Sequence, residues 1–145
     1  MTVSRSRRTD RGAVTVELTL LVPALLLVLG LLVAGGRIWF ARSVVTGTAQ
    51  TAARAASLAR TAGSAAVDGQ QAGRASLATA GLRCGSSSVQ VQTAAFAVPA
   101  GTPATVRATV RCTVPLADLG LPGLPGSLAL EGQGAAALDT YRGRE

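Results

Sequence analysis

Two kinds of residue in this sequence could carry chemistry. Glu17 stands at the mouth of an uncharged apolar run that extends from Leu18 to Gly36, and two cysteines, Cys84 and Cys112, lie far beyond it. A carboxylate at mid-membrane costs on the order of 2.5–3.5 kcal/mol on insertion scales, and less near the edge. An acid at this position therefore either has a function or is solvated at the depth of the headgroups.

The residue types do not favour catalysis. The sequence has no histidine, and hydrolytic chemistry usually needs a base beside a nucleophile or a pair of carboxylates. The sequence has no phosphate-binding loop and no dinucleotide fingerprint, and two cysteines without histidine do not suit a zinc site. The acids after Glu17 are far apart: Asp68, Asp118, Glu131, Asp139 and Glu145. We therefore expect no enzymatic activity, no cofactor, no metal and no small-molecule substrate.

The net charge is +7, and every basic residue is arginine. Most of the arginines are scattered and few aromatic residues accompany them, so nucleic-acid binding is not expected. The exception is a cluster immediately before the apolar run: Arg5, Arg7, Arg8 and Arg11. Basic residues beside a membrane span favour the cytoplasmic side. The cluster therefore predicts a cytoplasmic N-terminus and an extracytoplasmic remainder.

The apolar run is close to the ~20 residues that a helix needs to cross the hydrocarbon core. Pro23 should bend this helix, and Trp39 and Phe40 should lie at the far interface. Three interpretations compete for the segment. It is a secretory signal cut near Gly36, an uncleaved signal anchor in which Glu17 is merely tolerated, or a prepilin-type leader followed by a retained span.

The residues around Glu17 favour the third interpretation. Residues 12–17 read GAVTVE, they follow the arginine cluster, and LVPALL follows at residues 21–26. This arrangement resembles a type IV prepilin processing site, and the first forty residues resemble the TadE family of minor pilin-like proteins in tight-adherence (Flp-type) pilus systems. The resemblance implies cleavage between Gly12 and Ala13 by a prepilin peptidase at the cytoplasmic face. The partners that it implies are that peptidase, a major pilin and other minor pilins, Tad membrane platform proteins and the lipid bilayer.

Cleavage would give Glu17 a role. The freed amine of Ala13 would be largely cationic at neutral pH, and Glu17 lies four residues on, one helical turn away on the same face. It would also lie in the first turn, where the helix dipole favours a negative charge. The family picture pairs such a glutamate with the terminal amine of its own or a neighbouring subunit during assembly.

Beyond the span, the pattern predicts a helical stem over residues 37–62 that Gly63 and Ser64 end. Its small apolar face consists of Val45, Ala49, Ala52, Ala56 and Ala59. A second helix is expected over about 66–80, where Gly69 and Gly73 weaken the pattern.

After Gly81 the period changes to two. Strands are expected at 89–95 and 105–114, joined as a hairpin by a five-residue loop at 99–103. In the second of these strands, alternate residues should face inward: Val106, Ala108, Val110, Cys112 and Val114. A third strand could run from Ser127 to about Tyr141, weakened or bent by Gly132 and Gly134. The leucines of the loop at 119–126 pack either on their own domain or membrane surface, or on another subunit.

Cys84 and Cys112 fall on the predicted outer side of the membrane, where disulfides persist. They form either a bridge that ties the helix-to-sheet junction to the second strand or two buried thiols.

Together these patterns predict a membrane-anchored α+β, pilin-like protein with four parts: a leader at 1–12, a membrane helix at 13–36, a stem at 37–62 and an extracytoplasmic domain at 63–145. The expected function is a structural, pseudopilin-like subunit in assembly of a Flp/Tad-type pilus or related secretion apparatus. The alternative is a signal-anchored extracytoplasmic binding module unrelated to pili.

Overall fold

The computed structural model describes residues 10–119, 123 and 125–141; for residues 10–17 and 20 it describes the backbone alone. Its elements are two helices, α1 (Asp10–Leu58) and α2 (Ala62–Thr79), three strands, β1 (Ser86–Gln92), β2 (Thr105–Pro115) and β3 (Ser127–Ala137), and a short 3₁₀ helix, η1 (Ala94–Ala97). The chain divides into two compact units, residues 1–36 and 37–145, and α1 contributes to both. The α+β class with an apolar N-terminal helix and a small antiparallel sheet is confirmed.

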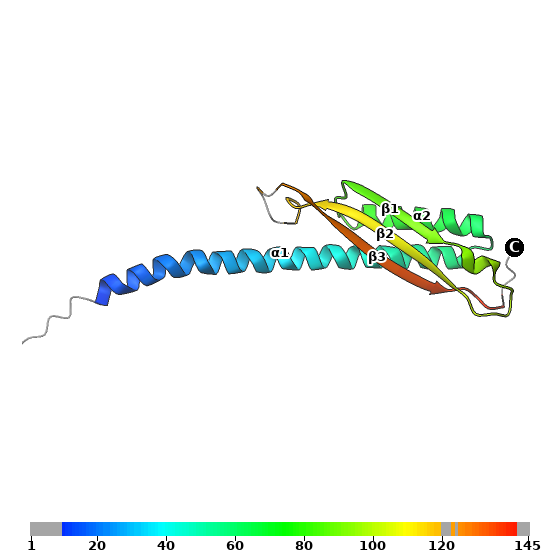
Figure 1. The fold of residues 1–145 in the computed structure, drawn as a ribbon, viewed down its shortest axis with the longest axis horizontal. Helices are drawn as coiled ribbons and strands as arrows, with labels where there is room; N and C mark the ends of the chain where they lie inside the picture. The colour runs from blue at the N-terminus through cyan, green and yellow to red at the C-terminus, as the bar shows by residue number, and fades with distance from the viewer. Residues whose placement is uncertain (1–9, 120–122, 124, 142–145) are drawn as a thin grey trace, which may run out of the picture. The chain divides into compact units, whose positions relative to one another are not determined.

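The three strands form one antiparallel sheet in the order β1-β2-β3 (Figure 1). The inward set expected on β2 is confirmed, because all five of its alternate residues are buried. The other face of the sheet is exposed and carries serine, threonine, glutamine, arginine, glutamate and alanine side chains. This is the half-buried strand pattern that an antiparallel sheet with one wet face produces.

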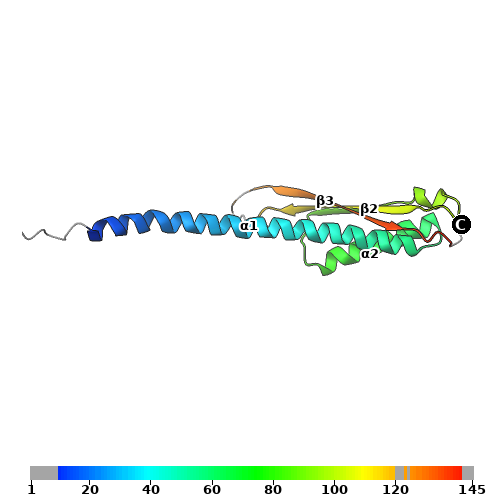
Figure 2. The same cartoon turned by 90° about the horizontal axis from the view of Figure 1, so that it is seen from below.

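Both helices of the second unit lie on the same face of the sheet (Figure 2). The apolar face predicted for the stem at 37–62 is confirmed, because Val45, Ala49, Ala52 and Ala56 are completely buried and Ala59, just beyond the end of α1, is partly buried. Val45, Ala49 and Ala52 are joined in the core by residues of α2, the strands and the loop after β2, among them Leu77, Val89, Cys112, Leu119 and Leu130.

Glycines in β3 let the strand approach the backbone of α1. A Cβ added to Gly132 would lie 2.7 Å from the backbone nitrogen of Thr46, and one added to Gly134 would meet the backbone of Ala49 and Gln50. Such separations are too short for any side chain. The expectation that these glycines weaken or bend the strand stays a prediction; the structure adds that they are buried in β3 and allow the contact with the helix.

Glycines play the same role in α2. Its buried face is Ala65, Gly69, Gly73 and Leu77, spaced by four residues. A Cβ on Gly69 would lie 2.8 Å from Val91 Cγ2 in β1. Gly69 and Gly73 interrupt the period of apolar residues expected of a helix, because α2 packs against the core through its smallest residues.

Several element boundaries differ from the expected ones. Helix α1 ends at Leu58, and Gly63 and Ser64 lie in the first turn of α2, where Thr61 is the N-cap and forms a capping box with Ser64. In this capping box each hydroxyl accepts a hydrogen bond from the backbone amide of the other residue, so the first turn of α2 forms at Thr61. Helix α2 thus begins earlier than the predicted residue 66.

The first strand also lies earlier than predicted. β1 ends at Gln92, and residues 94 and 95, expected as strand, lie in η1. The connection to β2 runs from residue 93 to 104 rather than through a five-residue loop. The serines at 86–88, which carried no hydrophobic alternation, pair with residues 111–113 of β2. Pairing with a strong central strand outweighs their weak β-propensity.

Of the leucines in the loop after β2, Leu119 is buried in its own domain. Leu121 and Leu124 lie outside the described residues.

The approach of β3 to α1 predicts opposite effects of two glycine-to-alanine substitutions. Gly132→Ala should lower the free energy of unfolding by about 1–3 kcal/mol, because the added methyl meets helix backbone rather than a movable side chain. Gly47→Ala is the control, since nothing lies within 4 Å of its added Cβ, and it should raise stability by roughly 0.5–1 kcal/mol. Denaturant unfolding of the full chain in detergent measures both; a neutral Gly132→Ala would contradict the packing.

Candidate membrane-anchoring and assembly site

The residues around the expected cleavage position have helical backbone. Gly12, Ala13 and Glu17 all lie within α1, near its first residue, Asp10. Their side chains lie outside the described part of the structure, as do the side chain of Arg11 and residues Arg5, Arg7 and Arg8. The cleavage position, the role of Glu17 and the topology that the arginines set therefore stay predictions.

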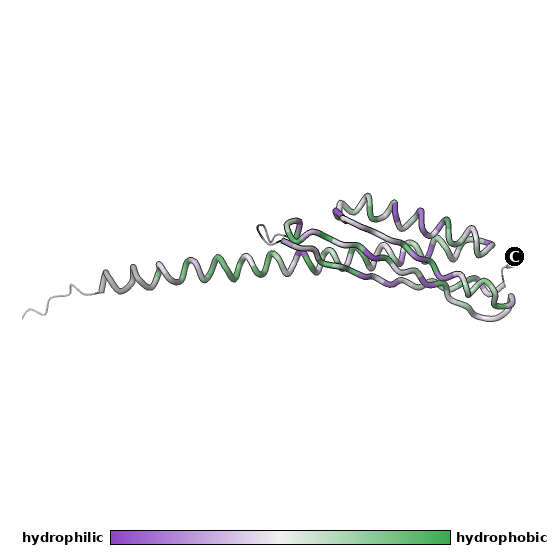
Figure 3. Tube along the Cα trace, turned by 45° about the horizontal axis from the view of Figure 1, so that its top comes forward, coloured by the Kyte–Doolittle hydropathy of each residue, from purple (hydrophilic) through white to green (hydrophobic). Residues whose placement is uncertain are grey.

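The part of α1 that follows Glu17 has an exposed aliphatic surface. The large apolar residues from Leu18 to Val33 whose side chains the structure describes are at least half exposed. Figure 3 shows the predominance of hydrophobic residues along this part of the helix. A core helix of a soluble protein would bury such residues, so this surface needs an apolar environment of another kind.

Length and composition make α1 a candidate membrane span between Leu21 and Leu58, near the N-terminus. Pro23 lies inside the helix without ending it. Gly30, Gly35 and Gly36 have nothing within 4 Å of an added Cβ. In lipid, small residues of this kind allow another helix to approach closely.

The beginning of the second unit carries two exposed aromatic rings. Trp39 is 73% exposed and Phe40 is 58% exposed. Trp39, Arg42, Ser43, Thr46 and Gly47 line a shallow hollow of about 600 Å³ on α1. The amphipathic indole of Trp39, beside an apolar ring and arginines, suits the boundary between lipid and water.

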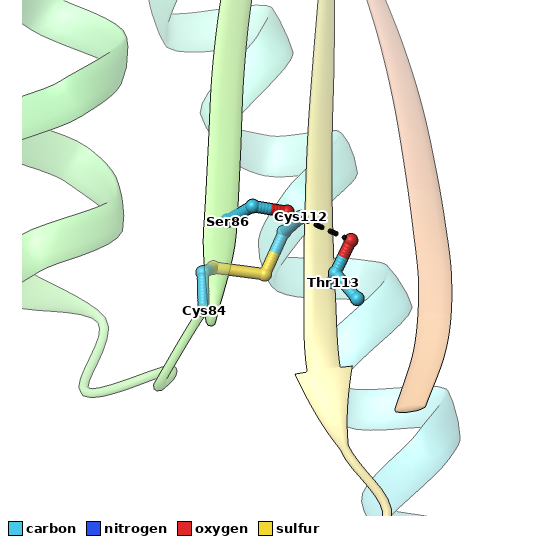
Figure 4. Close-up of a disulfide and its surroundings, with 4 residues drawn as sticks. All are labelled: Cys84, Ser86, Cys112 and Thr113. Atoms are coloured by element: carbon cyan, nitrogen blue, oxygen red, sulfur yellow. Dashed lines mark hydrogen bonds between the residues drawn. A yellow bond between two sulfur atoms is a disulfide. The ribbon is translucent and has the colours of Figure 1, made fainter. Parts of the chain in front are cut away.

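The two cysteines are joined. Cys84, just before β1, and Cys112, in β2, form a disulfide with a Cα–Cα separation of 5.4 Å (Figure 4). Cys112 is buried in the core. Next to the bridge, the hydroxyl of Ser86 donates a hydrogen bond to Thr113 Oγ1 at 3.1 Å. The bridge therefore fixes the entry of the chain into β1 against the central strand.

The exposed face of the sheet holds an ion pair between neighbouring strands. Arg111 Nε in β2 lies 2.8 Å from Glu131 Oε2 in β3, directly opposite in the register. Hydrogen bonds from Arg111 and from Gln133, together with the charge of the guanidinium, lower the pKa of the Glu131 carboxyl below its ordinary value. This carboxylate is thus held in its ionised form over the sheet.

The other acids whose side chains the structure describes are Asp68, Asp118 and Asp139. Among the described residues, no three histidine, cysteine, aspartate or glutamate side chains are placed to hold a metal ion. Three open hollows on the described chain are lined mainly by amides, hydroxyls, arginines and small apolar groups, and another also contains Asp139 and Tyr141 beside Ser57. Such groups can hydrogen-bond a partner.

The segment that contains the exposed apolar helix is similar to a known protein family. Residues 12–54 match the TadE-like protein family. The recognition drawn from the residues around Glu17 is thus confirmed. No curated protein and no solved structure matches the chain.

The TadE-like segment begins at Gly12 and ends inside the second unit, before α2 and the sheet. This segment suggests a protein associated with Tad pili. The apolar part of α1 could anchor such a pilus component in a membrane.

Sequence reasoning missed one side chain that positions the fold. Gln50 of α1 hydrogen-bonds the backbone of Ala135 in β3 through both ends of its amide. A single glutamine on an exposed helix face gives no local signal of such a contact, because its partner lies 85 residues away in the sequence.

Removing the disulfide should destabilise the protein. The bridge closes a loop across a sequence separation of 28 residues, which the chain-entropy model values at about 3–4 kcal/mol. Replacement of both cysteines by serine should lower the unfolding free energy of the full chain by about this amount. Mass analysis after alkylation without reductant should find no free thiol; two alkylated cysteines in the native protein would contradict the bridge.

The ion pair predicts a shift in the titration of Glu131. Because its pKa is lowered in the folded state, the pair contributes stability above the ordinary carboxyl pKa and loses it as the pH falls through the folded value. Arg111→Gln should return the pKa of Glu131 towards its ordinary value. NMR titration of the Glu131 carboxyl carbon in both proteins checks this, and identical midpoints would contradict it.

Proposed function

We propose that this protein is a pseudopilin-like structural subunit of a Flp/Tad-type pilus or a related secretion apparatus. A prepilin peptidase cuts it between Gly12 and Ala13, and the apolar helix is retained. The observation that carries the proposal is the TadE-like match, which begins at Gly12 and includes the exposed apolar helix. The exposed aliphatic surface from Leu18 to Val33 supports it, because this surface requires lipid or other helices.

The cut gives Glu17 its function. Once residues 1–12 are removed, Ala13 begins the helix and its amine carries a positive charge. Glu17 then lies in the first helical turn, where it pairs with this amine or with that of a neighbouring subunit. Pairing offsets the cost of placing both charges in the membrane, whereas loss of one partner leaves the other uncompensated.

The arginine cluster sets the orientation. Arg5, Arg7, Arg8 and Arg11 hold the N-terminus on the cytoplasmic side, and the disulfide-linked sheet lies outside, where disulfides persist. The proposed partners are the prepilin peptidase, a major pilin, other minor pilins, Tad platform proteins and the bilayer. The competing function is a signal-anchored extracytoplasmic binding module, in which Glu17 has no role.

The N-terminus and intact mass of the membrane-extracted protein from its native host test the processing step. The expected start is Ala13. Gly12→Val, which places a branched side chain at the cut, should leave the start at Met1. A wild-type start at Met1 would favour the plain anchor, and a start near Ile38 would indicate a secreted domain; either result contradicts the proposal.

A second experiment separates assembly from processing. Glu17→Gln should leave the start at Ala13 but lower incorporation of the subunit into its assembly, because the amine of Ala13 loses its partner. Asp68→Asn is the matched control, since it removes an exposed carboxylate on α2, away from the sheet edge, and should not change incorporation. Measured by co-purification with the pilus fraction, equal behaviour of the two variants would remove the role of Glu17.

A further inference from the structure

The outer edge of β3 is only partly occupied. Strand β3 lies at the end of the sheet order, so one of its sides has no neighbouring strand. At Ala135 the side chain of Gln50 fills this side. The Ala135 amide donates to Gln50 Oε1 at 3.2 Å, and Gln50 Nε2 donates to the Ala135 carbonyl at 2.9 Å. The glutamine amide thus pairs with this residue as another strand would.

The preceding part of the same edge is open. Backbone groups of a strand point alternately to its two sides, so Ala129, Glu131 and Gln133 turn their amides and carbonyls the same way as Ala135. Within the described residues, the structure gives these outward backbone groups no hydrogen-bond partner. An exposed edge of this kind is a template for pairing with another extended chain.

Charged side chains often protect such an edge, but here the one available charge is turned away from it. The carboxylate of Glu131 is bound to Arg111 at 2.8 Å, and Gln133 Nε2 lies 3.4 Å from its other oxygen. Both contacts hold it over the sheet. The neighbouring Ala129 is too small to block an approaching backbone.

Helix α1 provides a surface beside this edge. β3 crosses α1 where Gly132 meets Thr46 and Gly134 meets Gln50 (Figure 1). Trp39, Ser43 and Thr46 recur at helical spacing on the same flank as Gln50, and together with Arg42 they line the hollow on α1. A strand added to β3 would therefore lay alternate side chains over this flank.

We propose that the edge of β3 from Ala129 to Gln133 binds an extended strand of a partner polypeptide that directs an acidic side chain towards Arg42 and an apolar one towards Trp39. The open backbone groups require another backbone, and strand addition is a common way to satisfy them. Arg42 makes no ion pair among the described residues, and Trp39 leaves most of its ring exposed. The inference rests on residues 37–137 alone and not on the proposed processing.

Charge complementarity argues against a second copy of this chain as the occupant. Within the described strands the one acidic residue is Glu131, which is already bound by Arg111. No described strand of this chain can therefore offer Arg42 a free carboxylate. The partner is another polypeptide with its own acidic, alternating segment.

The test uses the full chain in detergent micelles and a synthetic peptide of about seven residues, the length of an ordinary strand. Threonine occupies its odd positions, and valine, glutamate and valine occupy its even positions. Binding should be saturable and should slow hydrogen exchange at the amides of Ala129, Glu131 and Gln133, with no change at Gln90 on β1. A peptide with arginine in place of glutamate should bind about fivefold more weakly.

Two kinds of variant test the backbone contacts and the charge contact separately. The double variant Ala129→Pro with Gln133→Pro removes two outward amides of β3 without removing a hydrogen bond to β2. It should weaken peptide binding by roughly tenfold or more. The control Ala129→Val retains the amide and should leave peptide binding unchanged. Arg42→Glu leaves the strand untouched and should reverse the preference between the two peptides. No binding, protection elsewhere, an unchanged preference in Arg42→Glu, or protection of the edge by self-association without peptide would each overturn the proposal.

Discussion

The close approach of β3 to the backbone of α1 sets the arrangement of residues 37–145. Gly132 and Gly134 allow this approach because any side chain at either position would meet helix backbone. The contact places Val45 and Ala49 under the sheet, where the inward residues of β2 cover them. It also brings Gln50 to the edge of β3, where its amide pairs with Ala135. A core built largely from alanine, glycine and valine gains stability only from such short separations, because small side chains offer little area to bury.

A thin core needs support from other sources. The Cys84–Cys112 disulfide provides covalent support where the chain enters β1, and the capping box of Thr61 and Ser64 begins α2 close behind α1. Glycines in α2 have the same effect as those in β3, because they let the helix lie in close contact with the valines of β1. The second unit thus combines close backbone packing, one bridge and one well-formed helix start.

The surfaces of the protein suit different surroundings. The aliphatic side chains from Leu18 to Val33 are exposed, as in a helix that meets lipid or other helices. The open face of the sheet is polar and holds the Arg111–Glu131 pair. The edge of β3 is of a third kind, because it offers backbone groups, and the flank of α1 beside it offers Trp39 and Arg42. A subunit of an assembly needs surfaces of this kind, because each can be occupied by a different neighbour.

The sequence by itself determined the apolar helix, the buried face of residues 37–58, the alternation of β2 and the resemblance around Glu17 that the TadE-like match confirmed. These are local patterns, and a period of two or of three to four residues is visible without knowledge of any partner. Only the tertiary structure decided the roles of Gly132, Gly134 and Gln50, the early start of β1 and the open edge of β3. Each of these depends on backbone atoms distant in the sequence, and a local pattern carries no information about which distant backbone will lie beside a glycine or a glutamine.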